Sequence, residues 1–147
     1  YYTRGHVAQT PTLGLHQARI ARSGEEVTLI CYGPMVDTCL EAAKEASQEG
    51  RKLEVIDVRS LSPLDMATVY ESVRRTTRAI VVQEAPRTQG VGAEIAARLG
   101  EELYYVMEAP VLRVTGWSTP SPPAKAEGEH IPDVDRILDA VDRSLAF

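Results

Sequence analysis

The stretch VVQEAPRTQGVGAEIAARLG, residues 81–100, places two glycines between an apolar segment and a helical pattern. A turn of this kind can hold the phosphates of a nucleotide, because backbone N–H groups at the start of a helix point at the ligand. Gly90 and Gly92 fit the first two positions of Gly-x-Gly-x-x-Gly, but Ile95 occupies the third, where only glycine allows close packing of helix and strand. No Gly-Lys-Ser/Thr follows. The pattern therefore argues against nucleotide binding of the Rossmann type.

A second interpretation keeps a small-anion site at this loop. Arg87, Thr88 and Gly90 would hold an anion at the positive first turn of the helix. In a simpler interpretation Thr88 caps the helix and the glycines serve only close packing. Glu84, at the end of the preceding strand, is then a structural partner of Arg87 or of backbone amides and not a catalytic acid.

The other residues with chemical potential are scattered along the chain. His6, His16 and His130 show no metal-ligand spacing. Cys31 and Cys39 lie in apolar segments with no histidine close by to activate a thiolate. We expect two reduced, buried thiols in a cytoplasmic protein, with no catalytic and no metal-binding residue in this chain.

The composition fits one soluble domain. The 147 residues are 44% hydrophobic and 25% charged, with a formal net charge of -5. The negative charge argues against nucleic acid or an anionic membrane as the main partner. No apolar run approaches the roughly 20 residues that a membrane span requires.

Strand and helix patterns alternate along the chain, which predicts an α/β fold with a mostly parallel sheet and helices on both faces. The predicted strands are 18–21, 27–33, 53–58, 79–84 and 111–115. The second helix is expected to begin with Ser62 at the N-cap, Pro63 at N1 and Asp65 at N3. The last helix is expected from Pro132, after a segment of irregular pattern from 115 to 131. Residues 1–17 are predicted to be an arm or linker, and 18–147 the domain.

Five segments occur in an order that matches a known family. They are VTLICYGPMV (27–36), EVIDVRSLSPLD (54–65), VVQEAPRTQGVGAEIA (81–96), APVLRVTGWSTPSPP (109–123) and PDVDRILDAVDRSL (132–145). Together they resemble the C-terminal domain of the β subunit of 2-oxo acid dehydrogenase E1 components, which has the transketolase C-terminal fold. The PPAK tetrapeptide and the later Pro-Asp-x-Asp-Arg are more similar to the bacterial branched-chain enzymes than to the pyruvate enzymes, which are the alternative.

The resemblance implies a three-layer α/β/α domain with a five-stranded sheet and one antiparallel edge strand. Strand 18–21 would lie beside 53–58, followed by 27–32, 79–84 and 111–115. Gly33 and Arg87 would then face each other where the strand order reverses, the place where α/β sheets bind ligands. A regulatory module that binds a small anion in this crevice is therefore an alternative function.

The resemblance further implies a non-catalytic domain for subunit assembly and E2 docking. The parent enzyme uses thiamine diphosphate and Mg²⁺ to decarboxylate a 2-oxo acid oxidatively and passes the acyl group to lipoyl on E2. In the family the cofactor lies between the α subunit and the N-terminal domain of β, so this chain alone is expected to be inactive and free of cofactor. The implied partners are the E1 α subunit, a second β subunit in an α2β2 assembly, and the E2 peripheral subunit-binding domain. By itself the chain is expected to form homo-oligomers through exposed apolar surface.

The E2 contact is expected at the acidic C-terminal segment. The carboxylate of Phe147, with Asp139 and Asp142, would meet arginines of the basic E2 domain. Ser118 stands where the family often has the acid of Asp-Thr-Pro, so one partner contact is expected to be weaker here. In the simpler interpretation these acids form a solvated helix face.

Overall fold

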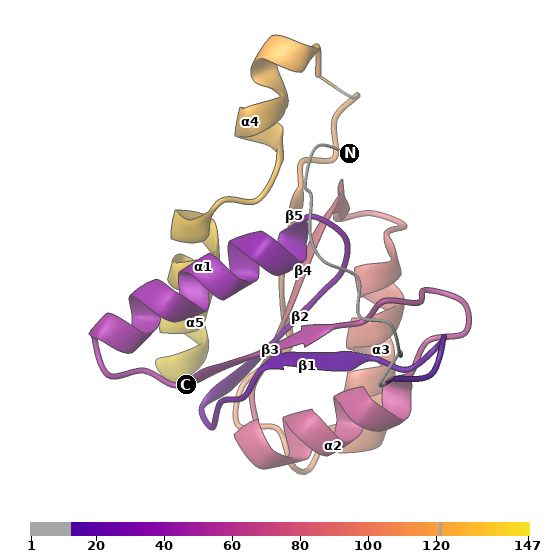
Figure 1. Cartoon of the computed structure of the whole chain (residues 1–147), viewed down its shortest axis with the longest axis vertical. Coiled ribbons are helices and arrows are strands. Elements are labelled where there is room, and N and C mark those ends of the chain that lie inside the picture. Colours follow the sequence, from indigo (N-terminus) through magenta and orange to yellow (C-terminus); the bar gives the residue numbers. More distant parts are fainter. Residues whose placement is uncertain (1–12, 121) are drawn as a thin grey trace.

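The computed structural model describes residues 13–120 and 122–147, so the first twelve residues of the predicted arm lie outside the described part. A five-stranded sheet lies between two layers of helices (Figure 1). The elements are β1 (Arg19–Arg22), β2 (Val27–Cys31), α1 (Met35–Gln48), β3 (Leu53–Asp57), α2 (Met66–Thr76), β4 (Ala79–Pro86), α3 (Val91–Leu103), β5 (Leu112–Gly116), η1 (Ala124–Ala126), α4 (Glu127–His130) and α5 (Val134–Leu145). The strand order is β1-β3-β2-β4-β5, with β1 antiparallel to β3 and the other neighbours parallel. The predicted fold class and strand order are confirmed.

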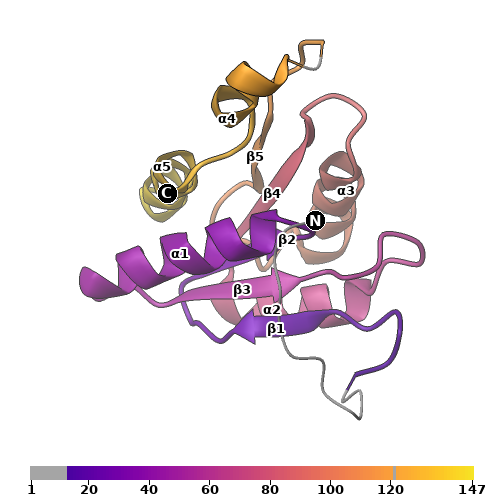
Figure 2. The same ribbon diagram turned by 45° about the horizontal axis from the view of Figure 1, so that its top comes forward.

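The sheet has an apolar core on each face. Along β2, Val27 and Leu29 belong to the core that α1 and α5 cover, whereas Ile30 points into the core beneath α2 and α3. All five residues of β2 are buried, as the continuous apolar run predicted for a central parallel strand. Figure 2 shows β1 at one edge of the sheet and β5 toward the other.

The predicted start of α2 was wrong by three residues. Asp65, not Ser62, is the N-cap, and its carboxylate accepts hydrogen bonds from the Thr68 N–H at 3.2 Å and the Thr68 hydroxyl at 2.7 Å. The same carboxylate accepts the Ala18 N–H at 2.9 Å, so it joins the entry to β1 to the start of α2. Ser62 and Pro63, joined by a cis peptide bond, precede the helix. Asp65 is the N-cap because its carboxylate accepts hydrogen bonds from donors of two segments, Ala18 before β1 and Thr68 in α2.

The last helix also begins later than predicted. Asp133 caps α5 by accepting the Arg136 N–H at 2.8 Å, so Pro132 stands outside the helix. The segment predicted to be irregular contains η1 and α4, and the Trp117 indole N–H donates to the Glu129 carbonyl at 3.0 Å. This bond fastens α4 to the chain directly after β5. In the part of the chain described here, no helix has the length and apolarity to cross a bilayer.

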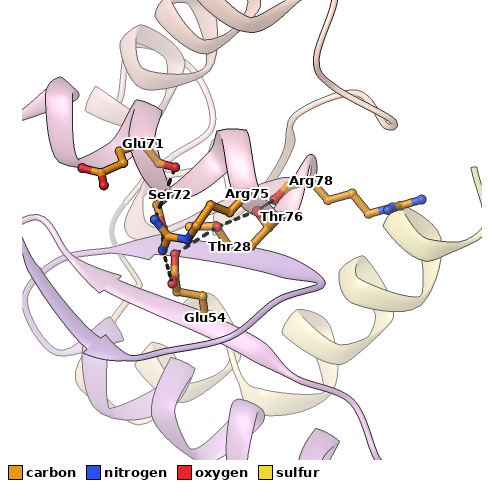
Figure 3. A network of polar contacts seen from close by, with 7 residues as sticks. All are labelled: Thr28, Glu54, Glu71, Ser72, Arg75, Thr76 and Arg78. Atoms are coloured by element: carbon orange, nitrogen blue, oxygen red, sulfur yellow. Dashed lines mark hydrogen bonds and ion pairs between the residues drawn. The ribbon is translucent and has the colours of Figure 1, made fainter.

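A polar network lies beneath α2 at the amino ends of β2 and β3 (Figure 3). The buried carboxylate of Glu54 lies 2.8 Å from Nη2 of Arg75 and 3.5 Å from the Thr28 hydroxyl, which donates to it. The Thr28 hydroxyl also lies 2.8 Å from that of Thr76. Because the carboxylate is both paired and hydrogen-bonded, it can be buried at the edge of an apolar core.

Candidate functional site

The loop between β4 and α3 is filled by the side chain of Gln83. Its Oε1 accepts the Gly92 N–H at 2.7 Å, and its Nε2 donates to the Pro86 carbonyl at 3.0 Å. A Cβ on Gly90 would collide with Nε2 of Gln83, and a Cβ on Gly92 would lie 2.7 Å from its Oε1. The two glycines therefore make room for a buried amide, and that amide occupies the position at which a phosphate would meet the helix N-terminus.

The three residues of the predicted anion site do not converge. Arg87 extends toward β5, where its Nη1 donates to the Arg113 carbonyl at 3.3 Å. The Thr88 hydroxyl lies 3.3 Å from the Ser118 hydroxyl, and the N-cap residue of α3 is Gly90, so the capping role expected for Thr88 was wrong. The anion site at Arg87, Thr88 and Gly90 stays a prediction that these contacts do not favour.

The crevice where the strand order reverses, between β2 and β4, is occupied by side chains of this chain. The Tyr32 hydroxyl donates to Oε1 of Gln83 at 3.4 Å. Burial raises the pKa of Tyr32, and the nearby charge of Glu84 raises it further. Gly33 has a φ of 59° and forms the turn from β2 into α1, while Glu84 makes no ion pair with Arg87. The anion-binding crevice near Gly33 and Arg87 stays a prediction, which the direction of Arg87 toward β5 does not favour.

The two thiols are buried and form no disulfide. The contact between Cys31 and Cys39, together with burial, raises the pKa of the Cys31 thiol, which keeps it protonated and unreactive. His16 lies 3.3 Å from the Ser60 hydroxyl. Within residues 13–120 and 122–147, no three His, Cys, Asp or Glu side chains gather as a metal site would require.

An acidic groove lies between α1 and α5. It encloses a cavity of about 340 Å³ whose charged lining is Glu45, Glu49, Arg51 and Asp142. Three carboxylates face one guanidinium, which leaves a net charge of -2. Asp142 forms an ion pair with Arg51, and this hydrogen bond raises the pKa of Arg51. Sequence reasoning found Asp142 but missed Glu45 and Glu49, because they are distant in sequence and only the packing of α1 on α5 brings them together.

The other predicted E2 contacts are divided among separate surfaces. Phe147 is 72% exposed and follows Asp142 by five residues, and Figure 1 shows this end of α5 remote from α4. Asp139 pairs with Arg143 at 3.7 Å and lines a different cavity on the opposite flank of α5. Ser118 follows β5 at the α4 end of the domain. The structure therefore joins Phe147 and Asp142 in one region and separates Ser118 from them.

An apolar patch is exposed at the C-terminal end of α3. Tyr104 and Tyr105 pack edge to face with ring centroids 5.1 Å apart, and Tyr105 is 97% exposed. Beside them lies a cavity of about 440 Å³ lined by Met107, Pro110 and Val111 among others. Clustered exposed aromatic residues of this kind mark protein contact surfaces more often than ligand sites.

Together these features define an α/β domain in whose described residues no catalytic set is recognisable. The family model "Transketolase, C-terminal domain" matches residues 16–137. The chain therefore belongs to the transketolase C-terminal domain family, as its sequence motifs predicted.

Curated relatives of the chain are β subunits of 2-oxo acid dehydrogenases. It is 52% identical, over its whole length, to "Pyruvate dehydrogenase E1 component subunit beta" of Leifsonia xyli subsp. xyli, of which it covers 44%. It is 47% identical over 99% of its length to "3-methyl-2-oxobutanoate dehydrogenase subunit beta" of Mycobacterium tuberculosis, of which it covers 42%. The chain thus spans less than half the length of these relatives.

A solved structure supports the same assignment of the fold. The structure of "Split gene transketolase, inactive beta4 tetramer" superposes with a TM-score of 0.81 at 26% sequence identity. The match covers 95% of this chain and 45% of that one.

Proposed function

We propose that the chain is the C-terminal domain of the E1 β subunit of a 2-oxo acid dehydrogenase, where it serves assembly and E2 docking. The observation that carries this proposal is the identity of 52% and 47% to two such β subunits across essentially the whole chain. The parent enzyme would decarboxylate a 2-oxo acid oxidatively and acylate lipoyl on E2. In this role the domain contributes surfaces, and the reacting atoms lie elsewhere in the parent.

The thiamine diphosphate and Mg²⁺ of such a parent do not fit the described residues. No three potential metal ligands gather in this part of the chain, and the amide of Gln83 fills the glycine-containing loop. We therefore assign the cofactor to portions of the enzyme beyond these 147 residues, and the absence of a cofactor site here stays a prediction. Thiamine diphosphate that bound tightly to this chain alone would overturn this assignment.

For the substrate we propose a branched-chain 2-oxo acid, with pyruvate as the alternative. The relatives include both types, at 47% and 52% identity. The PPAK tetrapeptide and the following Pro-Asp-x-Asp-Arg favour the branched-chain type. The test is to assemble the complete E1 and compare kcat/KM for 3-methyl-2-oxobutanoate and for pyruvate. A preference for pyruvate would decide for the alternative.

The docking surface that we propose for E2 is the acidic groove together with the exposed side chain of Phe147. Its net negative charge complements the basic peripheral subunit-binding domain, and such complementarity mainly speeds and orients association. Arg51 pairs with both Asp142 and Glu49 but compensates only one negative charge, so the excess charge of the groove comes from Glu45 and from one of these two carboxylates. Ser118 lies at the other end of α5 and is not part of this contact on the same chain.

The docking proposal is tested by calorimetry and stopped-flow association with the isolated E2 domain. Glu45→Gln with Glu49→Gln should slow association several-fold at low salt and less at high salt, whereas Phe147→Ala should lower the affinity with little dependence on salt. Glu101→Gln is the matched control, because Glu101 is an exposed acid on α3, in the other helical layer. Arg51→Gln should act in the opposite direction and speed association, since it makes the groove more negative. Equal rates and affinities for the wild type and all four variants would contradict the docking proposal and leave the domain assignment intact.

For subunit assembly we propose that the exposed aromatic patch of Tyr104 and Tyr105 contacts a neighbouring subunit. The related split-gene transketolase is described as a β4 tetramer, so a related chain associates with its own copies. Sedimentation of the wild-type chain and of Tyr105→Ser tests this proposal. A loss of self-association in the variant is expected, and a monomeric wild type would contradict the role of the patch.

A further inference from the structure

Four arginines gather on a flank of α5 that is separate from the acidic groove. A cavity of about 460 Å³ opens there between α5 and the edge strand β5. It is lined by four arginines, of which Arg113 lies on β5, Arg136 and Arg143 lie on α5, and Arg87 directly follows β4. We refer to these four residues and their cavity as the arginine groove.

The arginine groove is positive in a chain that is negative overall. Its only acidic lining residues are Asp135 and Asp139, so four arginines against two aspartates leave a net charge of +2. Among the contacts of residues 13–120 and 122–147, Arg143 is the one member of the four with an ion pair, to Asp139 at 3.7 Å. In the described part of the chain no carboxylate lies within ion-pair distance of Arg87 or Arg113. Because the chain carries a net charge of -5, this unpaired positive charge is not a consequence of composition.

Arg87 and Arg113 hold each other in place with part of their hydrogen-bonding capacity. Nη1 of Arg87 donates to the Arg113 carbonyl at 3.3 Å, and Nη1 of Arg113 donates to the Arg87 carbonyl at 3.1 Å. A guanidinium group has five N–H donors, so each side chain is positioned and still keeps donors for a ligand. Pre-positioned donors reduce the entropy cost of binding.

Arg136 brings a donor that has no acceptor in the described chain. Its Nη2 donates to the Thr115 carbonyl at 2.6 Å, and its guanidinium lies over the Trp117 ring at 4.4 Å. Its Nη1 is buried and has no hydrogen-bond partner. A buried, unsatisfied N–H of a charged group costs free energy, and an anionic oxygen in the adjoining cavity would remove that cost.

We propose that the arginine groove binds a small polyvalent oxyanion, carried on a phosphate- or carboxylate-bearing molecule. Planar guanidinium groups pair with two oxygens of such a group at once, which lysine side chains or helix ends do not match. This site is separate from the one predicted at Arg87, Thr88 and Gly90, since Gln83 fills that loop and Arg87 turns toward β5. The inference stands independently of the E1 assignment.

Trp117 provides the measurement, because it is the only tryptophan of the chain and lines the cavity. We would titrate the 147-residue chain with pyrophosphate and, separately, with citrate, holding ionic strength constant with NaCl. A saturable change in Trp117 fluorescence and a rise in Tm are expected for at least one anion. The comparison of the two anions distinguishes phosphate from carboxylate chemistry. A change that NaCl alone reproduces, or no saturable change with either anion, would overturn the proposal.

Substitution of individual arginines tests whether the anion binds in the arginine groove. Arg113→Gln and Arg87→Gln should each weaken binding by about tenfold or more, as expected for loss of a charge-assisted hydrogen-bond partner. Arg98→Gln is the matched control, because Arg98 is an exposed arginine on α3 that pairs with Glu94 at 2.7 Å. Trp117→Phe, measured by calorimetry, separates loss of signal from loss of binding. Equal weakening in Arg98→Gln would show non-specific charge screening and contradict the site.

Discussion

The side-chain oxygen of Gln83 lies 2.7 Å from the backbone nitrogen of Gly92, so a residue of strand β4 caps the helix that follows it. The amide is fully buried and also donates to the Pro86 carbonyl, which fixes the loop between strand and helix. Gly90 and Gly92 are required by this arrangement, since a side chain at either position would occupy the space of the amide. The sequence pattern of a phosphate-binding turn thus arises here from internal capping.

We predict that Gln83→Leu destabilises the domain by about 1–3 kcal/mol, because leucine has similar size and leaves the buried Gly92 N–H and Pro86 carbonyl without partners. Urea unfolding followed by circular dichroism measures the change in the free energy of unfolding. Gln48→Leu is the control, since Gln48 is exposed at the end of α1 and its replacement should stay within about 0.5 kcal/mol. Similar losses in both variants would refute the capping role.

Replacing each of two glycines of α3 by alanine should change the free energy of unfolding in opposite directions. A Cβ at Gly92 would lie 2.7 Å from Oε1 of Gln83 and 3.0 Å from Cγ1 of Val81, so Gly92→Ala should cost about 1–3 kcal/mol. A Cβ at Gly100 meets nothing within 4 Å, and Gly100→Ala should stabilise α3 by about 0.5–1 kcal/mol. Thermal and urea unfolding of both variants test the pair. The explanation fails if Gly92→Ala is neutral.

The architecture could be predicted because its signals are local and periodic. The apolar run at β2 and the alternation of elements required a parallel sheet, and the family motifs supplied the strand order. Helix starts were less predictable, because a cap is chosen by three-dimensional competition for donors. Asp65 replaced Ser62 through a bond to Ala18, 47 residues away in the sequence, and Gln83 replaced Thr88 from within the preceding strand.

The candidate surfaces were predictable only in part, because packing brings together residues that are distant in the sequence. Phe147 and Asp142 belong to one continuous acidic segment and could be found from composition. Glu45 joins them only because α1 packs beside α5. Of the arginine groove, sequence analysis named Arg87 as a possible anion ligand but not its three partners, since Arg87 and Arg136 are separated by 49 positions and no motif links them.

Asp65 should make stability depend on pH. Burial alone would raise the pKa of Asp65, but hydrogen bonds from the Thr68 hydroxyl and from the Ala18 and Thr68 N–H groups outweigh it and lower the pKa. Because the folded pKa lies below the unfolded value of about 3.9, the stabilisation is complete above that pH and is lost as pH falls through the folded pKa. Asp65→Ala should cost about 1–2 kcal/mol at pH 7, and the difference from wild type should narrow below about pH 4.

Urea unfolding of wild type and Asp65→Ala at several pH values between 2.5 and 7 provides this measurement, with about one pH unit between points. Asp37→Ala is the control, since Asp37 is an exposed acid in the first turn of α1 and should contribute only a few tenths of a kcal/mol, about what a helix dipole provides. A gap between wild type and Asp65→Ala that stayed constant across this range would contradict the role of the ionised carboxylate.

Arg74 and Arg75, neighbours on α2, should contribute differently to the free energy of unfolding. Arg75 pairs with the carboxylate of Glu54, which is 1% exposed, whereas Arg74 pairs with Glu102 at the surface. Arg75→Gln leaves the buried Glu54 carboxylate with the Thr28 hydroxyl as its remaining donor. Because Arg75 itself is half exposed, we expect the free energy of unfolding to fall by about 1–3 kcal/mol, less than for a fully buried pair. Arg74→Gln should cost at most about 1 kcal/mol.

A double-mutant cycle on this pair separates the buried charge from the rest of the network. Glu54→Gln removes the charge that Arg75 compensates, so adding it to Arg75→Gln should recover part of the lost stability. The corresponding cycle of Arg74 with Glu102 should give a coupling free energy of about 0–1 kcal/mol, since both partners face solvent. If the two cycles gave the same coupling, burial of Glu54 beneath α2 would have no energetic consequence, and its pairing with Arg75 would count as one more surface contact.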